Sequence, residues 1–385
     1  MNTQTPIGPV RLWNRNFWLM SFASLLLSMS VTMLIPTMPS WLLLHEGLTT
    51  EETGVVMGIF GVGLFLPGAF CSYLVQRYRR NLVCVWAVLL LALTMLLPLF
   101  VNFKGQWLLA AVVRLAQGAC YGLSQMILAS TLIIDTCQSA HRTEANHSTA
   151  WFSRFGLCVG PLVALLLVKM MGYFAVPVGS AVCCIVTAFL ILSVHFPFRV
   201  PYESPHLFSL DRFILTSGWP LLLFLFVFTV AVGLVLALPL NEHFYGLLMV
   251  GFLLSLLAQR IVFSNADLKS EVVSGLLFAG AALLLLITNP QSVLVSPLLG
   301  FGMGMVGARF LLFFVKLSHH CQRGTALSTF MLGWESGLAV GIGMGYLFFA
   351  DSRSSLLFVS LALIIIIIGA YVGGLHKWFL ANKIR

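Results

Sequence analysis

Charged side chains are scarce in this sequence. They make up 9% of its 385 residues, whereas an average soluble domain carries roughly 25%. Hydrophobic residues make up 59%, and the mean hydropathy is +0.99. A soluble fold has too little polar surface to cover so many apolar side chains, so lipid must be the solvent for most of the chain. The composition therefore predicts an all-α polytopic membrane protein.

Signatures of catalysis and of metal binding are also missing. The eight cysteines include no Cys-x-x-Cys pair and mostly lie in apolar runs, so we interpret them as small buried residues, not as disulfides or metal ligands. No glycine-rich phosphate loop follows a strand, and no nucleophile is paired with a base. We expect no enzyme activity, no cofactor and no metal site.

Long apolar runs are what the sequence does contain. A helix needs about 20 apolar residues to cross a bilayer. Breaks at polar clusters predict twelve such helices, at 16–42, 52–75, 82–102, 107–134, 147–170, 173–195, 213–239, 243–262, 271–288, 292–317, 325–349 and 354–378. The longest connection, 196–212, is rich in proline and follows the sixth run. It divides the chain into two six-helix bundles, 1–195 and 213–385, joined by a cytoplasmic linker.

The distribution of basic residues predicts the orientation. If the N-terminus is inside the cell, three basic residues fall in outer loops, namely Lys104, Lys169 and Arg353. Fifteen then fall in inner loops and tails, namely Arg11, Arg15, Arg77, Arg79, Arg80, Arg142, Arg199, Arg212, Arg260, Lys269, Lys316, Arg323, Lys377, Lys383 and Arg385. This bias predicts that both termini are cytoplasmic, in a cell membrane such as the bacterial inner membrane. It also explains the net charge of +9 without nucleic-acid binding.

A repeat relates the two halves of the chain. Arg154-Phe-Gly-Leu-Cys-Val-Gly-Pro161 reappears 181 residues later as Glu335-Ser-Gly-Leu-Ala-Val-Gly-Ile342. This offset predicts parallel repeats about an axis along the membrane normal. The shared glycines let a neighbouring helix approach closely, so we expect helix packing at Gly156, Gly160, Pro161, Gly337 and Gly341.

The residue that leads each copy of the repeat is charged, and the two charges are opposite. At 100° per residue, Arg154 lies about 200° around the helix from Gly156, and Glu335 stands in the same relation to Gly337. Both side chains should therefore point away from the glycine contact, towards their own bundle or a central cavity. Opposite charge alone does not make them an ion pair.

Four segments of the sequence form recognisable motifs, namely Met33-Leu-Ile-Pro-Thr-Met-Pro39, Arg114-Leu-Ala-Gln-Gly-Ala-Cys-Tyr-Gly122, Arg142-Thr-Glu-Ala145 and Gly156-x-x-x-Gly160-Pro161-x-x-Ala164. They resemble motifs of the Major Facilitator Superfamily, and the likeness extends over essentially the whole chain. The last is similar to the antiporter motif, with alanine where glycine is usual. The resemblance is to the drug/proton antiporter branch. It implies a secondary transporter that exports a small molecule by alternating access and is coupled to protons.

The loop after the second predicted helix departs from the family pattern Gly-x-x-x-Asp-Arg-x-Gly-Arg. Its places are taken here by Ser72, Gln76, Arg77, Arg79 and Arg80, so the gating aspartate is absent. The second half keeps more of the pattern, in Ala266-Asp267-Leu-Lys269.

Other charges could replace the missing aspartate at the inner gate. Asp135 could pair with Arg77, Arg80 or Arg142. Glu144 and Asp267 belong to the same group of predicted inner-gate charges.

Four ionisable residues fall inside the predicted helices, namely Arg114, Arg154, Arg309 and Glu335. Such residues are often functional because hydrocarbon does not solvate them. Glu335 is the only carboxylate well inside a predicted helix. A buried carboxylate can bind and release a proton as access changes, which suits a coupling residue. Alternatively, Glu335 pairs with an arginine or reaches water from the inner cavity.

Each arginine also has a functional and a structural interpretation. Arg154 could face the cavity, pair locally with Glu144 or Asp135, or extend to the inner surface. For Arg114, with Gln117, the resemblance implies a role in proton transfer or substrate orientation; alternatively it extends to the outer surface. Arg309 could face the cavity or extend to the inner end.

Several uncharged residues are weaker candidates. Tyr121, Gln125 and Trp334 could line a cavity, or they could simply pack. Trp151 is interpreted as an aromatic anchor at the inner interface.

Two functions follow from this sequence. The first is a monomeric transporter with a small anionic or zwitterionic substrate, since three buried arginines face one glutamate. The second is a protein of the same fold that is not a proton-driven pump, such as a sensor, a lipid flippase or an assembly partner.

Overall fold

The computed structural model describes residues 12–138, 141–196, 206–263 and 266–384. All regular secondary structure in these ranges is helical. The first half comprises α1 (Arg15–Thr32), α2 (Leu34–Leu44), α3 (Thr50–Gly63), α4 (Gly68–Arg77), α5 (Arg80–Leu96), α6 (Trp107–Ile127), α7 (Ile133–Asp135), α8 (Arg142–Met171) and α9 (Ala175–Leu192). The second half comprises α10 (Trp219–Leu236), α11 (Glu242–Ile261), α12 (Leu268–Thr288), α13 (Val295–Leu317), α14 (Arg323–Phe349), α15 (Arg353–Ala370) and α16 (His376–Asn382).

Some of these helices join into longer, interrupted segments. α1 and α2 are continuous as one candidate span, Arg15–Leu44, whereas α3 and α4 meet at a bend of 44°. A π-helical turn, Leu128–Leu132, links α6 to α7, and another, Tyr371–Leu375, links α15 to α16. Single π-turns inside helices often occur at functional sites.

Nine helices in the described ranges are long and apolar enough to cross a membrane, or ten if the bent α3–α4 pair is one span. This confirms the prediction of a polytopic helical membrane protein. The long helices α6 and α14 are not among the ten. They contain buried polar residues such as Arg114, Gln117 and Gln125, and α14 has most of its residues buried within the protein. Twelve spans therefore stay a prediction.

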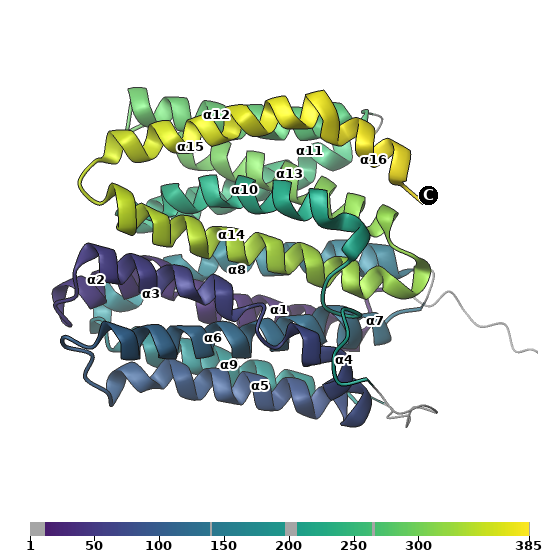
Figure 1. Cartoon of the computed structure of the whole chain (residues 1–385), viewed down its shortest axis with the longest axis horizontal. Coiled ribbons are helices and arrows are strands. Elements are labelled where there is room, and N and C mark those ends of the chain that lie inside the picture. Colours follow the sequence, from purple (N-terminus) through teal and green to yellow (C-terminus); the bar gives the residue numbers. More distant parts are fainter. Residues whose placement is uncertain (1–11, 139–140, 197–205, 264–265, 385) are drawn as a thin grey trace, which may run out of the picture.

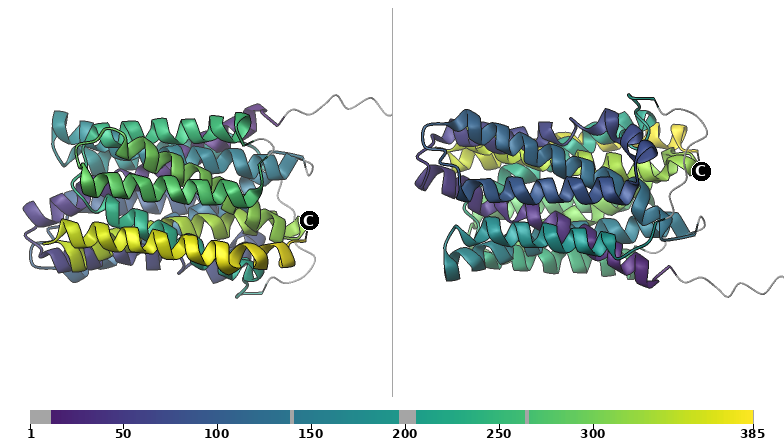
Figure 2. Two further views of the ribbon diagram at one scale, coloured as in Figure 1. Left: turned by 90° about the horizontal axis from the view of Figure 1, so that it is seen from above. Right: turned by 90° about the horizontal axis from the view of Figure 1, so that it is seen from below.

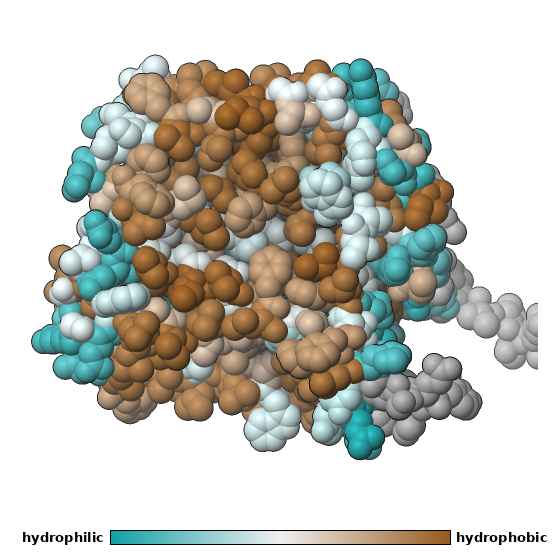
Figure 3. Space-filling model, viewed as in Figure 1, coloured by the Kyte–Doolittle hydropathy of each residue, from teal (hydrophilic) through white to brown (hydrophobic). Residues whose placement is uncertain are grey.

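The helices lie side by side in one bundle, with the first half below and the second half above in Figure 1. Both side views in Figure 2 show that α1 begins and α16 ends at the same end of the bundle. The halves meet where α14 packs against α3 and where α8 packs against α11. In Figure 3 apolar side chains cover the middle of the molecule and hydrophilic ones gather at its two ends, as expected for a protein surrounded by lipid.

The repeated glycines pack in the same way in both halves. A side chain added at Gly156 or Gly160 would meet Ser28 and Thr32 of α1. A side chain added at Gly337 or Gly341 would meet Thr229 and Val230 of α10, and Pro161 is buried within α8. The glycine face therefore holds α8 against α1 and α14 against α10, as the repeat predicted.

Candidate functional site

Glu335 lies between the two halves of the bundle. The hydroxyl of Tyr121 on α6 donates a hydrogen bond to the Glu335 carboxylate on α14, with 3.4 Å between the oxygens. The Gln125 side-chain amide in turn donates to the Tyr121 hydroxyl at 2.8 Å. These three residues line a small cavity of about 10 Å³ between α6 and α14, which has room for about one water molecule. Tyr121, Gln125 and Glu335, which sequence reasoning proposed separately, thus form one polar chain across the interface.

Glu335 has no cationic partner in this arrangement. Within the described ranges, no basic side chain lies within 4.0 Å of its carboxylate. The alternative in which Glu335 forms an ion pair with an arginine is therefore wrong for this conformation. Its hydrogen-bond partner is the neutral phenol of Tyr121.

Arg154 occupies a cage of aromatic rings. Its guanidinium carbon lies 4.9 Å from the centre of the Trp151 ring, 5.2 Å from that of Phe330 and 5.6 Å from that of Trp334. Trp151 belongs to α8 of the first half, whereas Phe330 and Trp334 belong to α14 of the second. Arg154 is 3% exposed, and none of its side-chain nitrogens has a hydrogen-bond partner among the described residues. A side chain at Gly307 of α13 would meet the guanidinium. We call these rings and Gly307 the arginine cage.

The cage corrects several expectations about this part of α8. Arg154 neither extends to the inner surface nor pairs with Glu144 or Asp135, because Glu144 contacts His141 and Asp135 contacts Arg80. Trp151, expected as an interface anchor, is 4% exposed and packs on Arg154.

Arg154 and Glu335 lie at matching positions but do not meet. Each stands twelve residues after the first residue of its helix, at 154 − 142 and 335 − 323. The face of α14 with Phe330 and Trp334 is turned to Arg154, whereas Glu335 is turned to Tyr121 on α6. At 100° per residue, Glu335 projects about 100° around α14 from Trp334, so the two charged side chains contact different neighbours.

Arg114 is enclosed within the first half. It is 3% exposed, and its guanidinium donates to the Gln117 side-chain oxygen at 2.9 Å. Gln117 donates in turn to the Thr94 carbonyl at 3.0 Å, and the Phe60 ring lies 4.5 Å from the guanidinium carbon. The expectation that Arg114 extends to the outer surface is wrong. Arg114 and Gln117 also lie outside the cavity that contains Glu335.

Arg309 forms an ion pair with Glu271 inside the second half. Two of its guanidinium nitrogens contact one carboxylate oxygen of Glu271, which links α13 to α12. The Glu271 side chain is 2% exposed and that of Arg309 is 18% exposed. Glu271 lies in the first turn of α12, at the end of the bundle where the termini lie, so Arg309 extends towards that end and does not line the cavity that contains Glu335. Sequence reasoning missed Glu271 because it is the first residue of its predicted helix, although α12 and α13 form a hairpin that brings it near Arg309.

The predicted inner-gate charges lie at the end of the bundle where the termini lie. Arg80 is 2.7 Å from the Asp135 carboxylate, whose pKa is raised by burial against the lowering effect of Arg80. Asp267 precedes α12, and Arg77 ends α4.

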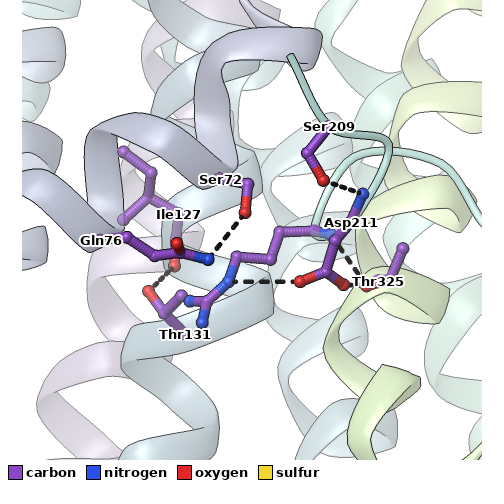
Figure 4. A network of polar contacts seen from close by, with 8 residues as sticks. Ser72, Gln76, Ile127, Thr131, Ser209, Asp211 and Thr325 are labelled. Carbon is purple, nitrogen blue, oxygen red and sulfur yellow. Dashed lines mark hydrogen bonds and ion pairs between the residues drawn. The ribbon is translucent and has the colours of Figure 1, made fainter. Parts of the chain in front are cut away.

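The halves touch at this same end of the bundle. Figure 4 shows the segment at Ser209 and Asp211 between α4 and α14, where Thr325 donates to the Asp211 carboxylate at 3.4 Å. Beside it, the Gln76 side chain donates to Ser72 at 3.1 Å.

The halves are in contact at the opposite end as well. Gly54 and Gly58 of α3 lie against Gly343 of α14, so closely that an added side chain would meet backbone atoms. Lys169 of α8 is 3.5 Å from Glu242 of α11. The space around Glu335 is therefore closed towards both ends of the bundle.

Two similarly built helical halves, which meet over buried polar and charged residues, define a membrane transporter. A sequence model of the Major Facilitator Superfamily matches residues 20–341, and the chain belongs to this family. It is a multi-pass membrane protein, and the proteins it resembles are transporters, not enzymes.

Solved structures support the fold alone, because sequence identity to them is low. A mutant of the nucleoside transporter NupG has a TM-score of 0.65 at 13% identity, over 93% of this chain and 99% of that chain. An auto-inhibited POT family peptide transporter has a TM-score of 0.65 at 13% identity, over 97% and 98%. A bacterial homologue of the iron transporter ferroportin, outward-facing with soaked iron, has a TM-score of 0.59 at 18% identity, over 94% and 99%. No curated protein matches the sequence.

Proposed function

We propose that this protein is a secondary transporter that exports a small molecule by alternating access and is coupled to protons through Glu335. The observation that carries this proposal is the position of Glu335. Its carboxylate lies between the halves and is bonded to Tyr121 of the opposite half, and no cationic side chain of the described ranges lies within 4.0 Å of it. An ionised carboxylate needs water or a cation, so binding of a proton favours the closed arrangement and loss of the proton favours opening.

The Tyr121–Glu335 contact links proton binding to movement of the halves. Alternating access in such folds is a rocking of one bundle against the other around a central site. When the halves separate, the 3.4 Å contact breaks and water reaches Glu335. The Gln125 amide keeps the Tyr121 hydroxyl oriented, because both belong to α6 and lie 2.8 Å apart.

The remaining parts of the proposal come from the sequence. We place the protein in a bacterial inner membrane as a monomer with twelve spans and both termini cytoplasmic. The antiporter-like segment from Gly156 to Ala164 supports export. Arg114 and Arg154, which have no carboxylate partner within 4.0 Å in the described ranges, support an anionic or zwitterionic substrate. The pair of Arg80 and Asp135 would serve at the inner gate in place of the missing aspartate.

Transport in proteoliposomes with an imposed pH gradient tests the coupling. A panel of organic anions and zwitterions is screened for substrate-dependent proton flux, and each active compound is tested with Glu335→Gln. This variant keeps the hydrogen bond from Tyr121 and cannot release a proton, so we expect exchange of substrate without gradient-driven accumulation. Glu51→Gln is the matched control, because Glu51 is an exposed carboxylate in the first turn of α3.

Two results would count against the proposal. Full gradient-driven accumulation by Glu335→Gln would show that another residue couples transport to protons. If no compound in a broad panel produced proton flux, the alternative of a sensor, flippase or assembly partner would be favoured.

A further inference from the structure

Arg114, Arg154 and Arg309, which lie inside the predicted helices, differ in their partners. Arg309 is neutralised by the Glu271 carboxylate, and Arg114 donates to Gln117. All three side-chain nitrogens of Arg154 are buried and have no hydrogen-bond partner in the part of the chain that the structure describes. No carboxylate in the described ranges lies within 4.0 Å of it. Arg154 is thus the buried cation whose partner the described part of the chain does not supply.

The aromatic rings of the arginine cage do not replace that partner. A guanidinium is attracted to the face of an aromatic ring by the ring's quadrupole. Its five N–H donors lie in the guanidinium plane and need acceptors such as carboxylate or phosphate oxygens. A buried cation whose donors are unsatisfied is costly, so a protein that keeps one is expected to pair it at some stage. The cage therefore holds the arginine in place while its donors stay available.

We propose that Arg154 is the anion-binding residue of the transport site, and that it binds the oxyanion of an organic substrate whose flat apolar part lies against Trp151, Phe330 and Trp334. This inference rests on the proposed function, because it takes the interface between the halves as the transport site. The cage is built from both halves, since Trp151 lies on α8 and the other two rings lie on α14. Separation of the halves opens it.

The position of Arg154 narrows the substrate class. In the closed arrangement Gly307 leaves room for the guanidinium and for nothing larger, so the oxyanion enters when α8 moves away from α13 and α14. A zwitterion would also need a carboxylate near the cage for its cationic group. Glu335 projects about 100° around α14 from the cage residue Trp334 and bonds to Tyr121, and no carboxylate in the described ranges lies within 4.0 Å of Arg154. The cage therefore favours an aromatic or other planar anion over a zwitterion.

Equilibrium binding to the full-length protein in lipid nanodiscs tests this inference. The probes are benzoate, phenyl phosphate and benzylamine, titrated up to about 10 mM and followed by tryptophan fluorescence, because Trp151 and Trp334 both contact Arg154. We expect saturable binding of benzoate, phenyl phosphate or both, and no binding of benzylamine. The preference between the two anions identifies the oxyanion as a carboxylate or a phosphate.

Variants assign the binding to Arg154. Arg154→Gln should weaken anion binding at least tenfold, and Arg154→Lys should weaken it less because the positive charge stays. The matched control is the double variant Glu271→Leu/Arg309→Met, which removes a different buried arginine together with its partner and should bind as the wild type does. Anion-dependent increases in thermal stability of the wild type, absent from Arg154→Gln, provide a second measurement.

Several outcomes would overturn the inference. They are binding of neither anion to the wild type, equal anion affinity in Arg154→Gln, or binding of benzylamine in preference to both anions. Glu335→Gln separates this inference from the proposed function, because it should retain anion binding whether or not Glu335 couples transport to protons. If Glu335→Gln kept proton-driven transport while Arg154→Gln lost anion binding, the coupling proposal would fail and the anion site would stand.

Discussion

Replacing one partner of the ion pair between Glu271 and Arg309 should lower the free energy of unfolding far more than replacing both partners by apolar residues. Their side chains are 2% and 18% exposed, and two guanidinium nitrogens contact one carboxylate oxygen. Removing one partner of such a pair typically costs about 3–5 kcal/mol, whereas replacing both by apolar residues is often neutral or stabilising. Glu271→Leu should therefore lower the free energy of unfolding by about 3–5 kcal/mol.

The two single variants should not be equivalent. Arg309→Met leaves a carboxyl group that can take up a proton, whereas Glu271→Leu leaves a guanidinium that stays charged. We expect Arg309→Met to be the milder change, and the double variant to be at least as stable as either single variant. The difference between the double variant and the sum of the singles should be several kcal/mol, as measured for close charge pairs elsewhere.

Unfolding by sodium dodecyl sulfate in mixed micelles, followed by fluorescence or circular dichroism, measures these free energies. The pair of Lys169 and Glu242 is the control, because its side chains are 73% and 30% exposed and its removal should cause little change. The reasoning is refuted if Glu271→Leu costs under about 1 kcal/mol, or if the double variant loses as much as the two singles together.

Three further predictions concern packing, the outer contact and topology. Gly337→Val should reduce the yield of monodisperse protein by size-exclusion chromatography, because overpacking costs about 1–3 kcal/mol, and Gly369→Ala, with open space around it, should not. Gly54→Val should push α3 away from α14, so that a cysteine at Ser40, which lines a cavity with Leu236 and Tyr346, is labelled faster by an impermeant maleimide; unchanged labelling would contradict close packing of the halves at this end of the bundle. Lys377→Cys should be labelled only after the cells are permeabilised, and labelling of intact cells would reverse the proposed orientation.

The glycine repeat shows what could be predicted without coordinates. Residues four apart lie on one helix face, so Gly156 and Gly160 form a strip without side chains that a neighbouring helix can approach closely. The duplication predicts the same strip at Gly337 and Gly341. The structure places both strips against equivalent helices, α1 and α10. Helical phase also predicted that Arg154 points away from this strip, which the contacts with Phe330 and Trp334 confirm.

The partners of the buried charges could not be predicted in this way. Phe330 lies 176 residues from Arg154 in the sequence, and Tyr121 lies 214 residues from Glu335. Helical phase specifies the direction of a side chain around its own helix axis. The helix that lies in that direction depends on how the halves are docked. The arginine cage and the cavity at Glu335 therefore could not be predicted from the sequence motifs.

The amino-acid sequence by itself determined that lipid surrounds most of the chain, that the protein is a polytopic helical membrane protein, and that its two halves are repeats. Apolar content, the lengths of the apolar runs and helical periodicity are local quantities, and each follows from the transfer of side chains into lipid. The tertiary structure alone decided that Arg309 is neutralised by Glu271, that Glu335 bonds to Tyr121, and that Arg154 is caged without an acceptor. These facts depend on contacts between helices distant in sequence, because the energy of a buried charge is set by whatever surrounds it.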